Sequence, residues 1–184
     1  MKILLLTPMD IEREKVIKAL SDIANPKHEY FVKVTGIGRE AMAKAMMDRP
    51  AHDICVLMGF GAVIGQAVDL PAYLQLGKPV EITNASLYGY EGGLFENGKP
   101  IVVGSKTNLP AKLSLTSDKF VRTTNLEKET IVNMEDYTFM FLKKPNDFII
   151  RIISDFLPHQ TEIDFFEEVK KIDFTEALLT LESI

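Results

Sequence analysis

Three carboxylates stand at positions where α/β proteins place groups that bind ligands. Glu12 comes soon after a short apolar run, Glu135 follows a second strand-like stretch, and Asp155 follows the strongly apolar run of residues 148–153. In open α/β sheets, ligands bind beside the carboxyl ends of the strands. We therefore expect these carboxylates to meet at one edge of a sheet and to form a ligand site.

Each carboxylate also has an interpretation without a functional role. Acids are common in the first turn of a helix because the helix dipole favours them there, and this applies to Glu12 and Glu135. Asp155 lies close to Arg151 in the sequence, so the two side chains also fit a structural salt bridge. For single residues these alternatives stay open.

The elements that position these groups follow from the apolar pattern and from glycine and proline. Ile3 to Leu6 predicts a strand buried on both faces, and Thr7 is expected to cap the helix that Pro8 begins. The Gly-Phe-Gly of residues 59–61 is expected to close the third strand as a turn. Strands are predicted over residues 3–6, 29–35, 53–58, 79–87, 101–104, 115–121, 129–132 and 148–153, and helices over residues 8–23, 39–49, 134–143 and from Asp164 onward.

Alternation of strands and helices is typical of the α/β class. We expect residues 1–184 to form a single three-layer domain, with a central mixed, mostly parallel twisted sheet that is flanked by helices. The stretch from about residue 65 to 112 is richer in glycine and proline, and there we expect antiparallel strands and surface loops.

Composition excludes several classes of function. The chain has 184 residues, with 21 Lys and Arg against 26 Asp and Glu, and this acidic balance gives no basic surface for nucleic acid. The one cysteine, Cys55, excludes an intramolecular disulfide, and His28, His52 and His159 are not spaced as metal ligands. No apolar segment is long enough to cross a membrane, so we expect a cytoplasmic protein without a metal site.

Five short stretches carry a more specific signal. They read Met-Asp-Ile-Glu at residues 9–12, Gly-Ile-Gly at 36–38, Thr-Ser-Asp-Lys-Phe-Val at 116–121, Val-Asn-Met-Glu at 132–135 and Arg-Ile-Ile-Ser-Asp at 151–155. In type and order they resemble motifs of the nucleoside phosphorylase / methylthioadenosine–adenosylhomocysteine nucleosidase superfamily. The resemblance implies a site that breaks the bond between a purine and ribose, without a cofactor, in a homodimer.

Carried over by position, the resemblance assigns catalytic roles to the three carboxylates. Asp155 would protonate the leaving purine at N7, and such an acid works best in an apolar, closed site. Glu135 would hold the ribose hydroxyls, and Glu12 would orient or deprotonate the attacking water.

The same resemblance assigns binding roles to further residues. Phe120 would stack on the purine and the main chain of Val121 would bind its edge, whereas Met9 and Met134 would pack against the ribose. Without the motifs, Phe120 and the two methionines would be interpreted as core residues. Arg151 and Ser154 share the motif of Asp155, and we place both, together with Phe60, among the residues that bind substrate.

Phe60 is a departure from the family pattern, which carries a serine in the glycine-rich turn after the third strand. A phenyl ring cannot donate a hydrogen bond to phosphate, so hydrolysis is favoured over phosphorolysis. Asp136 and Tyr137 replace small residues of the family, and the middle of the chain is shorter, although residues 88–93 are similar to a segment at the subunit interface of relatives. The leading hypothesis is a purine nucleosidase. The alternatives are a phosphorylase, a futalosine hydrolase, or a non-catalytic module that binds nucleosides.

Overall fold

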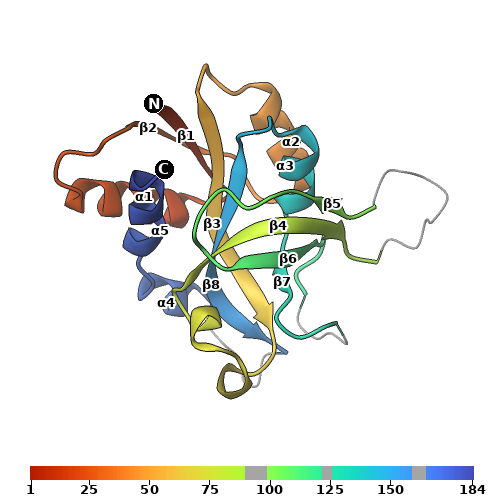
Figure 1. Cartoon of the computed structure of the whole chain (residues 1–184). Helices are drawn as coiled ribbons and strands as arrows, with labels where there is room; N and C mark the ends of the chain where they lie inside the picture. The colour runs from red at the N-terminus through yellow and green to blue at the C-terminus, as the bar shows by residue number, and fades with distance from the viewer. Residues whose placement is uncertain (90–98, 122–125, 159–164) are drawn as a thin grey trace.

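The amino-terminal half begins with a parallel βαβ arrangement. The structure is a computed structural model that describes residues 1–89, 99–121, 126–158 and 165–184. Strand β1 (Lys2–Thr7) lies between β2 (Glu29–Val34) and β3 (Ile54–Ile64) and pairs with both in parallel. Helices α1 (Asp10–Asp22) and α2 (Arg39–Met47) make the two connections (Figure 1).

The sheet closes on itself, which corrects the expectation of a twisted central sheet between two layers of helices. Five strands form the ring: β3 pairs with β7 (Ile131–Asn133) and with β8 (Phe148–Leu157), β8 with β4 (Pro79–Leu87), β4 with β6 (Ala111–Thr116), and β6 with β7. The β3–β7, β4–β8 and β4–β5 pairs are antiparallel and the others are parallel, as a mixed, mostly parallel sheet requires; β5 is Ile101–Val102.

Closure follows from the length of two strands. Strand β3 has 11 residues and β8 has 10, and they pair along most of their length. Strand twist accumulates along such a pair. One edge of β3 bonds β1 with its first half and β7 with its end, while the free edge of β8 bonds β4. Strand β4 is joined through β6 to β7, which pairs with β3, so the sheet returns to the strand from which it started.

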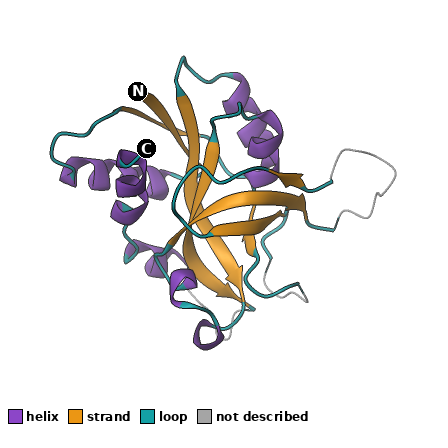
Figure 2. Cartoon of the chain, in the orientation of Figure 1, coloured by secondary structure: helices purple, strands orange, loops and turns teal. Residues whose placement is uncertain are grey.

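The helices cover two separate faces of the sheet (Figure 2). Leu4 and Leu6 belong to the cluster that packs with α2 and α3, whereas Ile3 and Leu5 belong to the cluster that packs with α1, α4 and α5. Successive side chains of a strand point to opposite faces, so the apolar run of β1 serves both cores. The remaining helices are α3 (Asp136–Leu142), α4 (Phe165–Lys170), α5 (Thr175–Glu182) and the short 3₁₀ turns Ala67–Asp69 and Ala72–Leu74. Among the described helices, none is both long and apolar enough to span a bilayer.

The predicted turn at residues 59–61 is wrong, because β3 continues through it to Ile64. A Cβ on Gly59 would lie 2.7 Å from Glu12 Oε1 and 2.9 Å from Arg151 Nη1. A Cβ on Gly61 would lie 2.7 Å from Ile131 Cγ2. These glycines therefore allow close approach of neighbouring groups inside a strand, instead of a change of direction.

Other boundaries also differ from the sequence-based expectation. Strand β6 spans Ala111–Thr116 and ends where a strand over residues 115–121 was expected, because Ser117 and its neighbours form a turn with the Ser117 hydroxyl bonded to Lys119. Thr7 ends β1, and Met9 takes the cap position of α1. The final helix is two helices, α4 and α5, and its expected start at Asp164 lies outside the described residues, as does most of segment 88–93.

Candidate active site

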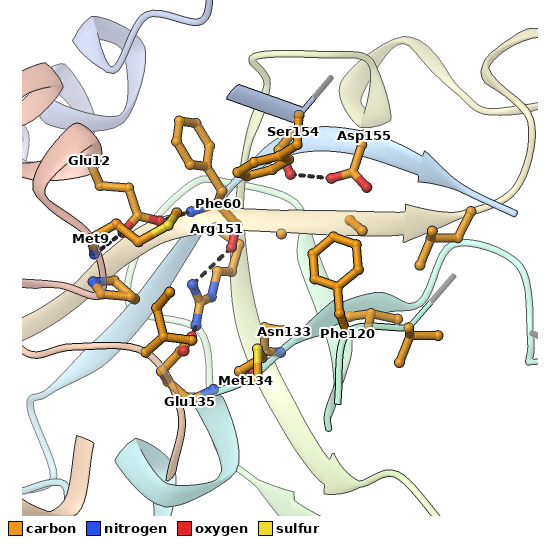
Figure 3. Close-up of a pocket in the computed structure, with 18 of the residues that line it drawn as sticks. Met9, Glu12, Phe60, Phe120, Asn133, Met134, Glu135, Arg151, Ser154 and Asp155 are labelled. Carbon is orange, nitrogen blue, oxygen red and sulfur yellow. Dashed lines mark hydrogen bonds and ion pairs between the residues drawn. The ribbon is translucent and has the colours of Figure 1, made fainter. Parts of the chain in front are cut away.

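A pocket of about 140 Å³ opens where β3, β7 and β8 end, beside the start of α1 (Figure 3). Every residue that the sequence placed in the site lines this pocket. They are Met9, Glu12, Phe60, Phe120, Val121, Met134, Glu135, Arg151, Ser154 and Asp155. The structure thus brings together residues that are as much as 146 positions apart in the sequence, from Met9 to Asp155.

Asp155 lies inside a strand and not beyond its end, which corrects the expected strand boundary. Strand β8 continues to Leu157, and its register with β3 shifts so that Gly61 pairs with Ile153 and Ala62 pairs with Asp155. The extra residue at this β-bulge is Ser154. A bulge re-aims the side chains that follow it, and here it places the buried Asp155 carboxyl in the pocket, where Ser154 Oγ donates a hydrogen bond to Asp155 Oδ1.

Glu12 is a helix-capping residue and a pocket residue at once. Its Oε2 accepts a hydrogen bond from the Met9 N–H at 2.7 Å, which satisfies a backbone donor at the start of α1. Its Oε1 accepts from the Phe60 N–H at 2.7 Å. The carboxylate is therefore fixed between α1 and β3. Each oxygen can accept a further hydrogen bond.

The buried Glu12 carboxyl makes folding stability depend on pH. Burial is the largest cause that acts on it and raises its pKa from the ordinary value of 4.5 to about 8. The folded chain holds this proton where the unfolded chain releases it, so the stabilisation is complete below pH 4.5 and is lost as the pH rises through about 8. We expect Glu12→Gln to remove this part of the pH dependence of the unfolding free energy, measured by urea denaturation across that range.

The control for this measurement is Glu14→Gln, because Glu14 is exposed on the same helix. The unfolding free energy of Glu14→Gln should depend on pH in the same way as that of the wild-type chain. An unfolding free energy that varies with pH in the same way in Glu12→Gln and in the wild type would contradict the assignment to Glu12.

Arg151 joins Glu135, which lines the pocket, to the buried Asp136 behind it. Only 1% of its surface is exposed. Its Nη1 donates to the Phe60 carbonyl oxygen at 2.9 Å, and its Nη2 donates to Glu135 Oε2 at 2.9 Å. Nε and Nη2 both donate to Asp136 Oδ1, at 2.8 and 2.6 Å. The salt bridge of Arg151 is thus made with Glu135 and Asp136, while Asp155 lies on the other side of the bulge.

The Gly-Ile-Gly motif reaches the site through its backbone. Gly36 and Gly38 have φ angles of +88° and +94°, which glycine adopts without the strain that other residues meet there. The Gly38 N–H donates to Glu135 Oε1 at 2.9 Å. Glu135 is therefore held by a backbone amide on one oxygen and by Arg151 on the other.

The two predicted aromatic residues differ in their surroundings. The Phe60 ring packs edge-on against Phe165 and Phe174, with ring centroids 6.0 and 5.2 Å apart, so its side chain belongs to a core cluster while its main chain binds Glu12 and Arg151. Phe120 is 59% exposed and lies on the rim of the pocket. The interpretation of Phe120 as a core residue is therefore wrong.

Two polar residues of the site were not predicted as such. Asn133 lines the pocket beside Met134, and Asp136 holds Arg151 without lining the pocket. A polar residue on each side of the Met-Glu pair was the only signal in the sequence. Within the described part of the chain, no three His, Cys, Asp or Glu side chains are grouped to hold a metal ion.

The chain is similar to known proteins in its structure. No protein-family model and no curated protein sequence matches the chain. A structure of a putative 5′-methylthioadenosine/S-adenosylhomocysteine nucleosidase from Borrelia burgdorferi, bound to adenine, has a TM-score of 0.75 at 18% identity, over 98% of both chains. The nucleosidase of Campylobacter jejuni has a TM-score of 0.72 at 19% identity, over 100% of this chain and 97% of its own.

A third similar structure is that of the nucleosidase from S. pneumoniae with the transition-state inhibitor MT-ImmA. Its TM-score is 0.71 at 17% identity, and the match covers 100% of this chain and 97% of the other. Each of the three matches covers nearly the full length of both compared chains, so it includes the closed sheet and its helices. The chain therefore has the fold of the 5′-methylthioadenosine/S-adenosylhomocysteine nucleosidases, as the resemblance of its motifs implied.

Proposed function

We propose that the protein is a purine nucleoside N-ribosyl hydrolase of the methylthioadenosine/adenosylhomocysteine nucleosidase kind. The observation that carries the proposal is the meeting of Glu12, Glu135 and Asp155 in one small pocket at the strand ends of this fold. Similar structures contain adenine or a transition-state inhibitor, which supports a purine nucleoside as the ligand. The chemistry needs a proton for the departing purine and a nucleophile for the sugar.

Asp155 is the proposed general acid. It is buried beside apolar residues, and Ser154 fixes its carboxyl through a hydrogen bond to Oδ1. A proton on the other oxygen would pass to purine N7, so that the base leaves as a neutral molecule. Phe120, on the rim of the same pocket, would cover one face of the purine.

Glu12 and Glu135 serve the sugar in this proposal. Glu12 has both oxygens fixed by backbone N–H groups. Once it is ionised, as its pKa of about 8 allows in mildly alkaline solution, an oxygen so fixed can accept the proton of a water that attacks the anomeric carbon. Glu135 would accept the hydroxyl protons of the ribose. When Glu12 is ionised, the two carboxylates also stabilise the positive charge that develops on the sugar in the transition state.

The charge around the site favours water over phosphate as the nucleophile. Arg151 already binds Glu135, Asp136 and the Phe60 carbonyl, so its guanidinium is not oriented toward an incoming anion. Phe60 provides no hydroxyl. A phosphorylase would have to place a phosphate anion among carboxylates, which is unfavourable at short range.

The proposal is tested by incubation with methylthioadenosine, adenosylhomocysteine, adenosine and inosine, with and without phosphate, while released base is measured. We expect release that does not depend on phosphate. Release only with phosphate would establish the phosphorylase instead, and saturable binding without release would establish the non-catalytic module, which Phe60 favours. A futalosine hydrolase would release base from futalosine alone. A homodimer and a cytoplasmic location remain predictions.

A further inference from the structure

A short chain of hydrogen bonds fixes the orientation of the Asn133 side chain at the end of β7. The Tyr137 N–H donates to Thr116 Oγ1 at 2.9 Å, so the Thr116 hydroxyl proton is directed to Asn133 Oδ1, 3.1 Å away. Asn133 Oδ1 also accepts from the N–H groups of Glu135 and Asp136, at 3.0 and 2.8 Å. If the amide were flipped, its NH₂ group would face the N–H donors of Glu135 and Asp136, and neither side could accept. The hydrogen-bond network therefore determines the orientation of the amide.

The other end of this amide has no partner within the described residues. Asn133 Nδ2 is buried and makes no hydrogen bond, and the residue is only 7% exposed. Asn133 lines the pocket, next to Met134 (Figure 3). A buried donor without an acceptor is unfavourable by about 1–3 kcal/mol. Such a group in a ligand pocket indicates that the ligand supplies the acceptor.

Glu135 shows what kind of acceptor fits beside Asn133. An ionised carboxylate only accepts hydrogen bonds, and Glu135 already accepts from Gly38 and Arg151. A sugar hydroxyl is both donor and acceptor. Glu135 can take the hydroxyl proton, but it cannot satisfy the hydroxyl oxygen. Asn133, two residues before it, offers the missing donor.

The position of Asn133 selects one hydroxyl of the ribose. Its partner Thr116 ends β6, and the chain continues from there to Phe120, the proposed stacking residue. Asn133 thus connects the purine side of the pocket with Glu135 on the ribose side. The hydroxyl nearest to the base of a nucleoside is the one on C2′.

We propose that Asn133 is a substrate-binding residue whose Nδ2 donates a hydrogen bond to the oxygen of the ribose 2′-hydroxyl, while Glu135 accepts that hydroxyl's proton. The inference rests on the proposed function, because it names the contact that holds the ribose. It predicts that the protein distinguishes ribonucleosides from 2′-deoxyribonucleosides, and that Asn133 contributes to this distinction.

The test is a thermodynamic cycle between residue 133 and the 2′-hydroxyl. Asn133→Asp keeps an oxygen for the Glu135 and Asp136 N–H groups and removes the donor. The dissociation constants of adenosine and 2′-deoxyadenosine are measured by calorimetry in the Asp155→Asn background, in which hydrolysis is removed. The preference for adenosine should fall about tenfold in Asn133→Asp, the loss of one net hydrogen bond of about 1.4 kcal/mol.

Two further variants make the result decisive. Asn133→Ser removes the amide nitrogen and keeps a shorter side chain, whose hydroxyl oxygen can still accept from the N–H groups at the start of α3. It replaces Asn133→Asp if that chain does not fold. Asn84→Asp is the control, because Asn84 lies on β4 and does not line the pocket. It should leave the preference unchanged.

An equal preference for adenosine in the parent chain and in the folded variant would overturn the inference, as would the absence of any adenosine binding. Base release by the wild-type chain is measured in parallel. Release of base together with an unchanged preference would leave the hydrolase standing and would remove only the role of Asn133. If nucleosides bind and the cycle gives the predicted loss of preference, but the wild-type chain releases no base, the role of Asn133 would stand and the hydrolase would be excluded.

Discussion

Asp155→Asn should reduce the rate of base release by a factor of about 100 to 10,000, which is the usual contribution of a general acid. Asparagine has nearly the same shape as aspartate but has no acidic proton to give to purine N7. Nucleoside binding should persist, because the bulge that positions residue 155 is set by the pairing of β8 with β3. The measurement is kcat for adenine release from methylthioadenosine, together with the dissociation constant of adenine.

The matched control is Asp118→Asn. Asp118 lies near Phe120 in the sequence but is exposed, and it forms an ion pair with Arg39 outside the pocket. Its replacement should change kcat by less than about twofold, because exposed ion pairs contribute little. If Asp155→Asn folded like the wild type and kept its kcat, Asp155 would not be the general acid.

Arg151→Met should have the largest effect on stability, a loss of about 3–5 kcal/mol in the unfolding free energy. Arg151 is buried, and it is the cation that compensates Glu135 and Asp136. Without it these two carboxylates remain buried without their positive partner. Burial already raises the pKa of Asp136, while the charge of Arg151 lowers it. The measurement is urea denaturation at neutral pH.

Two comparisons establish the cause of this loss. Arg39→Met removes the same side chain from the exposed pair with Asp118 and should cost less than about 1 kcal/mol. Asp136→Asn in the Arg151→Met chain should restore part of the stability, because it removes one uncompensated charge. If Asp136→Asn destabilised the double variant further, uncompensated charge would not be the reason for the loss.

The local pattern was sufficient for many of the elements. The run from Ile3 to Leu6 identified a strand buried on both faces, since β1 contributes alternate residues to two cores. Strand β4 was predicted over its full extent, Pro79–Leu87. Such predictions succeed because burial imposes its period on a few neighbouring residues. The family motifs then supplied nine of the ten residues of the expected site, all but Phe60, and all ten line one pocket.

The errors occurred where contacts between distant segments decide the structure. Gly59 and Gly61 have the composition of a turn, but they lie in a strand that pairs with β8. The missing side chains let Glu12, Arg151 and Ile131 come close to that strand. The end of β8 was placed too early because Ser154 and Asp155 are polar. Pairing with β3 extends the strand, and the bulge directs Asp155 to the pocket.

The sequence by itself determined the α/β class, most of the strands, and ten of the residues that meet in the pocket, because each depends on local periodicity or on a short motif. Only the tertiary structure decided that the sheet closes, that the Phe60 ring packs into a core while its backbone holds Glu12, and that Asn133 has a donor without a partner. These features depend on register and on bonds such as that between Gly38 and Glu135, 97 residues apart. A local pattern says which face of a strand is buried, but it does not say which distant group lies against that face.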